Sequence, residues 1–165
     1  MIRRAKIEEL NSLMLLLRAV IANLNSLGID QWDEIYPDAV TINNDIQERT
    51  LFVLEEDGVI KGMVVLNEFQ DKEYIDVEWR HAVGKALVVH RLSVHPSYQG
   101  QGVARRLMHF TERFADDNGY TSIRLDTFSK NPITMSFYKS LRYGIAGTVN
   151  FRKGLFYCFE KAIRE

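Results

Sequence analysis

Residues 92–106 read Leu92-Ser93-Val94-His95-Pro96-Ser97-Tyr98-Gln99-Gly100-Gln101-Gly102-Val103-Ala104-Arg105-Arg106. The segment begins as an apolar strand, passes through a short loop with two glycines and enters an amphipathic helix. Glycine lets a backbone approach an anion closely and adopt positive φ. The N-terminus of a helix offers unpaired N–H groups at the positive end of its dipole. The segment therefore predicts a pocket for a phosphate or pyrophosphate group.

The charges of the same helix are also informative. Arg105 and Arg106 fall in its first turn, where cations oppose the dipole by roughly 0.3–1 kcal/mol each. A bound anion would turn that opposition into an attraction; the alternative is that both side chains simply project into water. Other phosphate motifs are excluded by spacing, because a dinucleotide fingerprint needs a third glycine where Arg105 stands. The chain also lacks the Gly-Lys-Ser/Thr run of a P-loop.

The spacing that does fit is Gln/Arg-x-x-Gly-x-Gly/Ala, with Gln99, Gly102 and Ala104 at its defined positions. Here the sequence resembles the GCN5-related N-acetyltransferase (GNAT) superfamily. The resemblance implies that this loop holds the pyrophosphate of coenzyme A through backbone amides, and that the preceding strand hydrogen-bonds the pantetheine arm. The coenzyme-binding residues implied are Leu92, Ser93, Val94, Gln99, Gly100, Gln101, Gly102, Val103, Ala104 and Arg105.

A second segment, residues 131–143, resembles the Asn-x-x-Ala-x-x-Phe-Tyr-x-x-x-Gly-Phe pattern of the same family. Asn131, Phe137 and Tyr138 are in place, whereas Thr134 replaces the alanine and Arg142 stands where glycine ends the helix. The resemblance adds Asn131 and Tyr138 to the coenzyme-binding set. It also makes Tyr138 the general acid that protonates the departing thiolate; the alternative is a core aromatic beside Phe137. The resemblance is strong over residues 86–143 and looser elsewhere.

Transfer of an acyl group to an amine also needs an oxyanion donor and a group that takes a proton, because alkylamines are mostly protonated at neutral pH. The family pattern makes the backbone N–H of Val94 the oxyanion donor. His90 is a candidate base, but strict alternation places it on the face of Leu92 and Val94, which favours a core histidine. Glu73 and Glu78 are weaker candidates. The default is a water chain without a side-chain base.

Periodicity and turn residues give the expected elements. Helices are predicted over 7–27, 38–47, 103–118 and 132–141, and strands over 51–54, 59–66, 86–94, 122–127, 143–149 and 155–162. This order indicates an α/β (α+β) fold in one domain, residues 1–165. The resemblance specifies a GNAT-like acyl-CoA N-acyltransferase fold, a mixed, mostly antiparallel sheet with helices on both faces. By family analogy, strands 86–94 and 122–127 splay apart to admit pantetheine.

Composition excludes several other classes. The chain has 165 residues and a formal net charge of −1, which argues against nucleic-acid binding. Its longest apolar run, residues 13–17, is too short for a membrane span, and no signal peptide is evident. One cysteine, Cys158, excludes an internal disulfide. The histidines show no metal-ligand spacing. We therefore expect a cytoplasmic protein without a metal.

The acyl acceptor is less well defined. Trp32, Tyr36 and Trp79 could wall an acceptor cleft, or they could close the core under long loops. Residues 31–37 look like a segment of uncharacterised bacterial members of the family. The expected function is transfer of the acetyl group of acetyl-CoA to a small-molecule or protein amine, by direct attack in a ternary complex. The alternative is an acyl-CoA-binding sensor or degenerate domain without turnover. A homodimer could form if strands within residues 143–162 pair at an exposed sheet edge.

Overall fold

The computed structural model describes residues 1–164, which form two units. The first unit comprises residues 1–66 and 90–111, and the second comprises residues 67–89 and those from 112 onward. The strands follow the order β1-β2-β3-β4-β5-β7-β6, a mixed and mostly antiparallel arrangement as predicted. The expectation of a single domain over residues 1–165 stays a prediction, and residue 165 lies outside the described part.

The first unit begins with a strand that the sequence did not predict. Its elements are β1 (Ile2–Arg4), η1 (Ile7–Glu9), α1 (Leu10–Ser26), α2 (Ala39–Gln47), β2 (Leu51–Glu56), β3 (Val59–Asn67, except its last residue), the second half of β4 (Ala86–Val94), η3 (Pro96–Tyr98) and the first part of α3 (Val103–Asp117). Strand β1 has three residues and pairs antiparallel with β2, Arg3 opposite Val53. The β2–β3 hairpin turns at Asp57 and Gly58, both at positive φ, as the Asp-Gly signal predicts.

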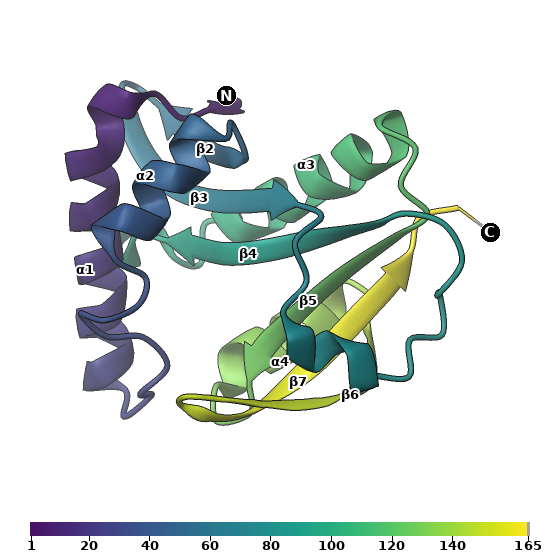
Figure 1. Cartoon of the computed structure of the whole chain (residues 1–165). Helices are drawn as coiled ribbons and strands as arrows, with labels where there is room; N and C mark the ends of the chain where they lie inside the picture. Colours follow the sequence, from purple (N-terminus) through teal and green to yellow (C-terminus); the bar gives the residue numbers. More distant parts are fainter. Residues whose placement is uncertain (165) are drawn as a thin grey trace. The chain divides into compact units, whose positions relative to one another are not determined.

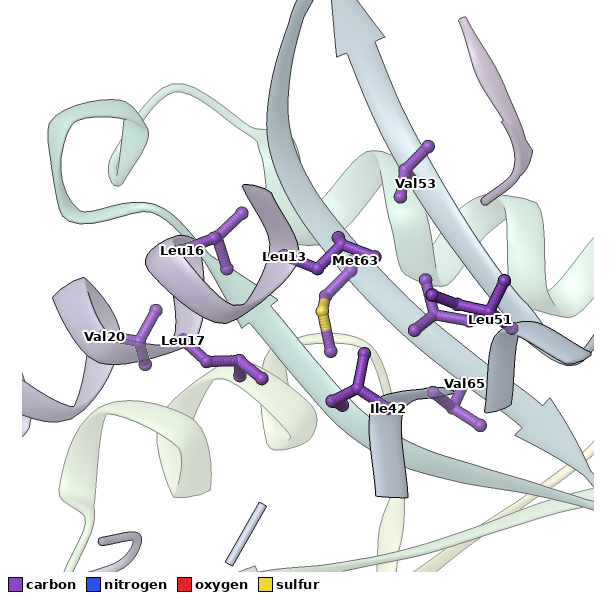
Figure 2. Close-up of a cluster of buried hydrophobic side chains, with 10 residues drawn as sticks. Leu13, Leu16, Leu17, Val20, Ile42, Leu51, Val53, Met63 and Val65 are labelled. Carbon is purple, nitrogen blue, oxygen red and sulfur yellow. The ribbon is translucent and has the colours of Figure 1, made fainter. Parts of the chain in front are cut away.

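One hydrophobic core of this unit lies between the two N-terminal helices and the β2–β3 hairpin (Figures 1 and 2). Leu13 and Leu17 of α1 and Ile42 of α2 are fully buried there, against Met63 and Val65 of β3. Helix α1 has the predicted apolar stripe. Helix α2 begins where predicted, because the Asp38 side chain accepts a hydrogen bond from the Thr41 N–H at 2.9 Å.

Helix α3 packs close to β3 at Gly62. A Cβ at that position would lie 2.9 Å from the Ser93 carbonyl oxygen and 2.9 Å from Cγ1 of Val103. Of the predicted stripe of α3, Val103 and Leu107 are buried, but Phe110 and Phe114 are only half-buried. The other fully buried positions of the helix are Met108, Thr111 and Ala115. The buried face of the helix therefore differs from the predicted stripe in its second half, whereas Val103 and Leu107 lie close to Gly62 as the predicted stripe requires.

The second unit contains the first half of β4, η2 (Lys72–Asp76), β5 (Ser122–Phe128), α4 (Pro132–Ser140), β6 (Gly144–Phe151) and β7 (Gly154–Ala162). Strand β5 pairs antiparallel with β7 over its whole length, and β7 pairs with β6. Strand β4 pairs with β5 in parallel over residues 86–88 and 122–124. The expected splaying of these strands concerns the residues beyond this pairing and stays a prediction.

The end of α4 shows how Arg142 takes the place of glycine. Arg142 adopts φ 67°, the left-handed conformation that glycine adopts without strain. Its N–H donates to the Lys139 carbonyl at 3.0 Å, and the Tyr143 N–H donates to the Tyr138 carbonyl at 3.1 Å. The helix end is therefore that of a glycine cap, built with an exposed arginine. No helix in the described part of the chain is both long and apolar enough to cross a membrane.

Candidate active site

Strand β4 contains a residue of irregular backbone conformation, Arg91, in the first unit. Arg91 has φ 52°, an uncommon conformation for a residue with a side chain. The Ser93 hydroxyl, which is buried, donates to the Arg91 carbonyl at 3.1 Å. Strict alternation is not assured through such a residue, so the placement of His90 on the face of Leu92 and Val94 stays a prediction. His90 itself is half-buried.

The Arg91 guanidinium is held by two residues of the same unit. It donates to both oxygens of Asp45 on α2, at 2.8 and 2.6 Å, and to the Tyr36 hydroxyl at 2.7 Å. The side chains of Arg91 and Asp45 are only 10% and 8% exposed. Burial raises the pKa of the Asp45 carboxyl, and the two hydrogen bonds from Arg91 oppose that rise. Such a bidentate pair fixes the strand irregularity to α2 and to the 31–37 loop.

The glycine loop after β4 has the features expected of an anion cradle. Gly100 and Gly102 have φ 74° and 80°, and a Cβ at either would meet nothing within 4 Å. Within residues 1–164, no oxygen accepts from the N–H groups of Gly100, Gln101 or Gly102. The first N–H groups of α3 also lack acceptors within the helix. Backbone donors of this kind can hold a phosphate group; the predicted role of the loop in binding coenzyme A stays a prediction.

The remaining loop contacts are made by side chains. The Gln99 amide donates to the Val94 carbonyl at 3.4 Å, and that of Gln101 donates to the Ser97 carbonyl at 3.2 Å. Arg106 forms an ion pair with Glu56 of β2. Lys61 and Arg106 together lower the pKa of the Glu56 carboxyl to about 2. Arg106 is therefore held by Glu56. Arg105 is an exposed residue of the same helix turn.

Tyr138 lies in the second unit, on α4. It is 5% exposed, and its ring packs against Phe137, Tyr143 and Phe159 at centroid distances of 5.2, 6.0 and 5.8 Å. Burial, and to a smaller extent the charge of Asp126, raises the pKa of Tyr138 above its ordinary value. The hydroxyl therefore stays protonated at neutral pH, which suits a proton donor.

Asn131 caps the same helix. Its side-chain oxygen accepts from the Thr134 N–H at 3.3 Å, and the residue is buried. Thr134, which replaces the alanine of the family pattern, places its hydroxyl 2.5 Å from that of Thr127 on β5. The departure from the pattern thus adds a contact between α4 and the strand.

The second unit also holds a carboxylate that the sequence analysis did not single out. Asp126 lies in β5 and accepts a hydrogen bond from the Tyr74 hydroxyl at 2.5 Å. Burial raises the pKa of the Asp126 carboxyl to about 6. Burial and the charge of Asp126 raise the pKa of the Cys158 thiol to about 12, so that thiol is a neutral core group. The sequence signal that could have identified Asp126 is a carboxylate between Leu125 and Thr127 in a strand whose other residues are buried.

The predicted aromatic residues fall in different units. Trp32 packs against the core of the first unit, and Tyr36 is 39% exposed beside Arg91. Trp79 belongs to the second unit, where its Nε1–H donates to the Tyr74 carbonyl at 3.0 Å and the Arg124 guanidinium lies 4.3 Å from its ring centroid. Within residues 1–164, no group of three or more histidine, cysteine, aspartate or glutamate side chains is placed to hold a metal ion.

Comparison with known proteins identifies related molecules. The model of the Acetyltransferase (GNAT) family matches residues 18–143. The uncharacterized N-acetyltransferase YesJ of Bacillus subtilis is 25% identical over 148 residues, covering 85% of this chain and 79% of that protein. A GNAT-family acetyltransferase of Streptococcus agalactiae has a TM-score of 0.85 and 25% identity, over 98% of this chain and 94% of its own. The acetyltransferase yncA of Salmonella typhimurium, solved with its cofactor acetyl-CoA, has a TM-score of 0.72 and 19% identity, over 100% and 94% of the two chains. The predicted fold class is confirmed.

Proposed function

The chain belongs to the acetyltransferase (GNAT) family and is an acetyl-CoA-dependent acyltransferase, and we propose that it transfers the acetyl group to a primary amine by direct attack in a ternary complex. One observation supports the assignment of the coenzyme site. Within residues 1–164 the N–H groups of Gly100–Gly102 have no acceptor, and a Cβ at Gly100 or Gly102 would meet nothing within 4 Å. Oriented backbone donors of this kind bind phosphate groups.

The coenzyme-binding roles are proposed from the positions of the residues in the two family motifs. The backbone amides of residues 99–105 hold the pyrophosphate, and the main chain of residues 92–94 holds the pantetheine arm, with Asn131 and Tyr138 contributing from α4 by the family pattern. Arg105 adds a positive charge beside the phosphates. When bound, acetyl-CoA supplies the acetyl group as a thioester. The bound anion also offsets the cost of placing Arg105 in the first turn of a helix.

The catalytic roles follow from the same residues. We assign the backbone N–H of Val94 to the carbonyl oxygen, where charge develops as the amine attacks. Tyr138 donates its proton to the departing thiolate. Because the pKa of Tyr138 is raised, its hydroxyl is protonated at neutral pH before the thiolate leaves. Tyr138→Phe should therefore lower turnover much more than it weakens coenzyme binding. Undiminished turnover would remove the assignment.

The acceptor is an amine of a small molecule or of a protein. Trp32, Tyr36 and Trp79 remain proposed acceptor contacts. For Tyr36 the support is its exposure beside Arg91. The two other aromatic residues already make contacts within their own units. His90 also stays only a candidate.

Thermal unfolding with acetyl-CoA, free CoA and NAD tests the function. A ligand that binds the folded state alone raises the melting temperature, by RT ln(1 + [L]/Kd) in free energy. We expect a rise with both CoA species at about 1 mM and none with NAD. A sensor without turnover would show the same rise but no release of thiol with any amine. A melting temperature that CoA leaves unchanged would refute the coenzyme site.

A further inference from the structure

Asp126 is a charged residue in the middle of an otherwise buried strand. In β5 its neighbours Leu125 and Thr127 are buried, whereas Asp126 itself is half-buried. On β7 it faces Cys158, which is fully buried. The parallel pairing of β5 with β4 ends at Arg124, two residues earlier. Asp126 is therefore among the first residues of β5 after that pairing ends.

Within residues 1–164, one oxygen of this carboxylate accepts a hydrogen bond and the other accepts none. The Tyr74 hydroxyl donates to Oδ2 at 2.5 Å, and Tyr74 is fixed by burial and by Trp79, whose ring centroid lies 5.2 Å away. Within residues 1–164, no other group donates a hydrogen bond to Asp126. Asp126 is half-buried, and the hydrogen bond from Tyr74 sets the orientation of its carboxylate.

The groups around Asp126 do not neutralise it. Tyr74 from η2, Cys158 from β7 and Tyr138 from α4 all stay protonated because their pKa values are raised. Asp71, which precedes η2, is acidic and disfavours a second negative charge.

The nearest cation on the same strand is engaged elsewhere. The Arg124 guanidinium lies over the Trp79 ring and donates to the Gln70 side-chain oxygen at 2.8 Å. Asp126 is thus a carboxylate without an ion-pair partner, and it is more basic than an exposed one.

We propose that Asp126 is the general base that takes a proton from the acceptor amine. The inference rests on the proposed function and names the group that the amine must meet. Two titratable groups of the second unit would then have opposite roles. Asp126 is ionised near neutral pH and accepts a proton at Oδ1, whereas Tyr138 remains protonated and donates one. Environments that move two such groups apart in this way define an acid and a base.

The protons balance as follows. Asp126 takes one proton from the ammonium form of the acceptor and returns it to solvent. The freed amine nitrogen forms the bond to the acetyl carbon as the carbon–sulfur bond breaks, and the sulfur receives the proton of Tyr138. The nitrogen then loses a second proton, which restores the Tyr138 hydroxyl through solvent. The products are the amide, the free thiol and one proton.

Two variants separate a base from a structural anchor. Asp126→Asn keeps an oxygen that accepts from Tyr74 but cannot take a proton, and Tyr74→Phe removes the hydrogen bond but keeps the carboxylate. The probe is the best substrate from a panel of ethanolamine, putrescine, benzylamine and lysine methyl ester. Asp126→Asn should lower kcat/KM by about 10²–10⁴-fold, the usual contribution of general base catalysis. Tyr74→Phe should retain most activity, with the acidic limb of its pH profile moved to higher pH, because Tyr74 stabilises the ionised carboxyl.

Hydroxylamine provides an internal control, because it is neutral near pH 8 and needs no base to become a nucleophile. Asp126→Asn should lose far less activity with hydroxylamine than with the alkylamine. A readout without turnover is the carbon NMR signal of the Asp126 carboxyl, which should titrate near pH 6 in wild type and move to higher pH in Tyr74→Phe. Both variants should keep the rise in melting temperature with CoA.

Several outcomes would overturn the proposal. One is an equal loss of kcat/KM in Asp126→Asn and Tyr74→Phe. Another is a loss in Asp126→Asn that is as large with hydroxylamine as with the alkylamine. A third is a pH profile that Asp126→Asn leaves unchanged while CoA still binds. Absence of turnover with every amine, although CoA raises the melting temperature, would also count against an alkylamine acceptor and its base. Absence of the CoA effect in wild type would refute the proposed function instead.

Discussion

Replacing Asp126 by asparagine should stabilise the folded protein at neutral pH. The unfolded carboxyl has a pKa of 3.8 and the folded one a pKa of about 6. Between these values the folded state binds more protons than the unfolded state, so wild-type stability falls as pH rises through this window. A shift of about 2 units corresponds to roughly 3 kcal/mol, at 1.4 kcal/mol per unit. Above about pH 6 the full cost is present.

The asparagine variant lacks this titration but keeps the shape and the acceptor for Tyr74. The difference in unfolding free energy between variant and wild type should therefore be near zero at pH 4. It should grow to roughly 3 kcal/mol by pH 7. Other groups titrate alike in both proteins and cancel in the difference. For a chain of this size the change in melting temperature is about 2–4 °C per kcal/mol.

Urea unfolding followed by circular dichroism, at steps from about pH 4 to 8, measures this difference directly. Free energies that run parallel for the two proteins would mean that the Asp126 carboxyl titrates at the same pH when folded and unfolded. That result would refute the electrostatic reasoning and remove one support for Asp126 as a base. A variant less stable than wild type at pH 7 would refute it as well.

Other predictions follow from individual contacts. Gly62→Ala should destabilise the protein by about 1–3 kcal/mol, since its Cβ would meet Ser93 and Val103 at 2.9 Å; Gly144→Ala, with nothing within 4 Å, is the matched control in urea unfolding. Arg142→Gly should stabilise by up to about 1 kcal/mol because it relieves the positive φ, and an equal gain from Arg142→Ala would contradict this. Asp45→Ala leaves the Arg91 charge buried without its partner and should cost about 3–5 kcal/mol in chemical denaturation. Tyr36→Phe should cost much less, and similar losses for both would refute the ion-pair argument.

Local signals were sufficient for most of the fold. The cap at Asp38, the turn at Asp57-Gly58 and the glycine loop before α3 each depend on residues a few positions apart, which a sequence displays directly. Strand β1 was missed because three residues carry no period. Its formation depends on pairing with β2 about 50 residues later. Such non-local contacts override local preference.

In the candidate site, too, features that depend on neighbouring residues could be predicted and those that depend on distant residues could not. The loop donors and the cap by Asn131 could be predicted, since they are properties of a loop and of a helix start. The positive φ of Arg91 could not be predicted, because no local residue pattern announces it; its side chain is held by Asp45, 46 positions away. The hydrogen bond of Tyr74 to Asp126 spans 52 positions. Only the presence of a carboxylate within the predicted strand could be read from the sequence.

Arg91 and Asp126 show two ways of placing a charge in a strand. Arg91 has a bidentate carboxylate partner and a phenol, so its burial is compensated and its task is to hold a backbone shape. Asp126 has one neutral donor and an acidic neighbour, so its charge costs stability at neutral pH. Asparagine would keep the same hydrogen bond at lower cost. The proposed proton transfer, by contrast, requires a carboxylate at this position.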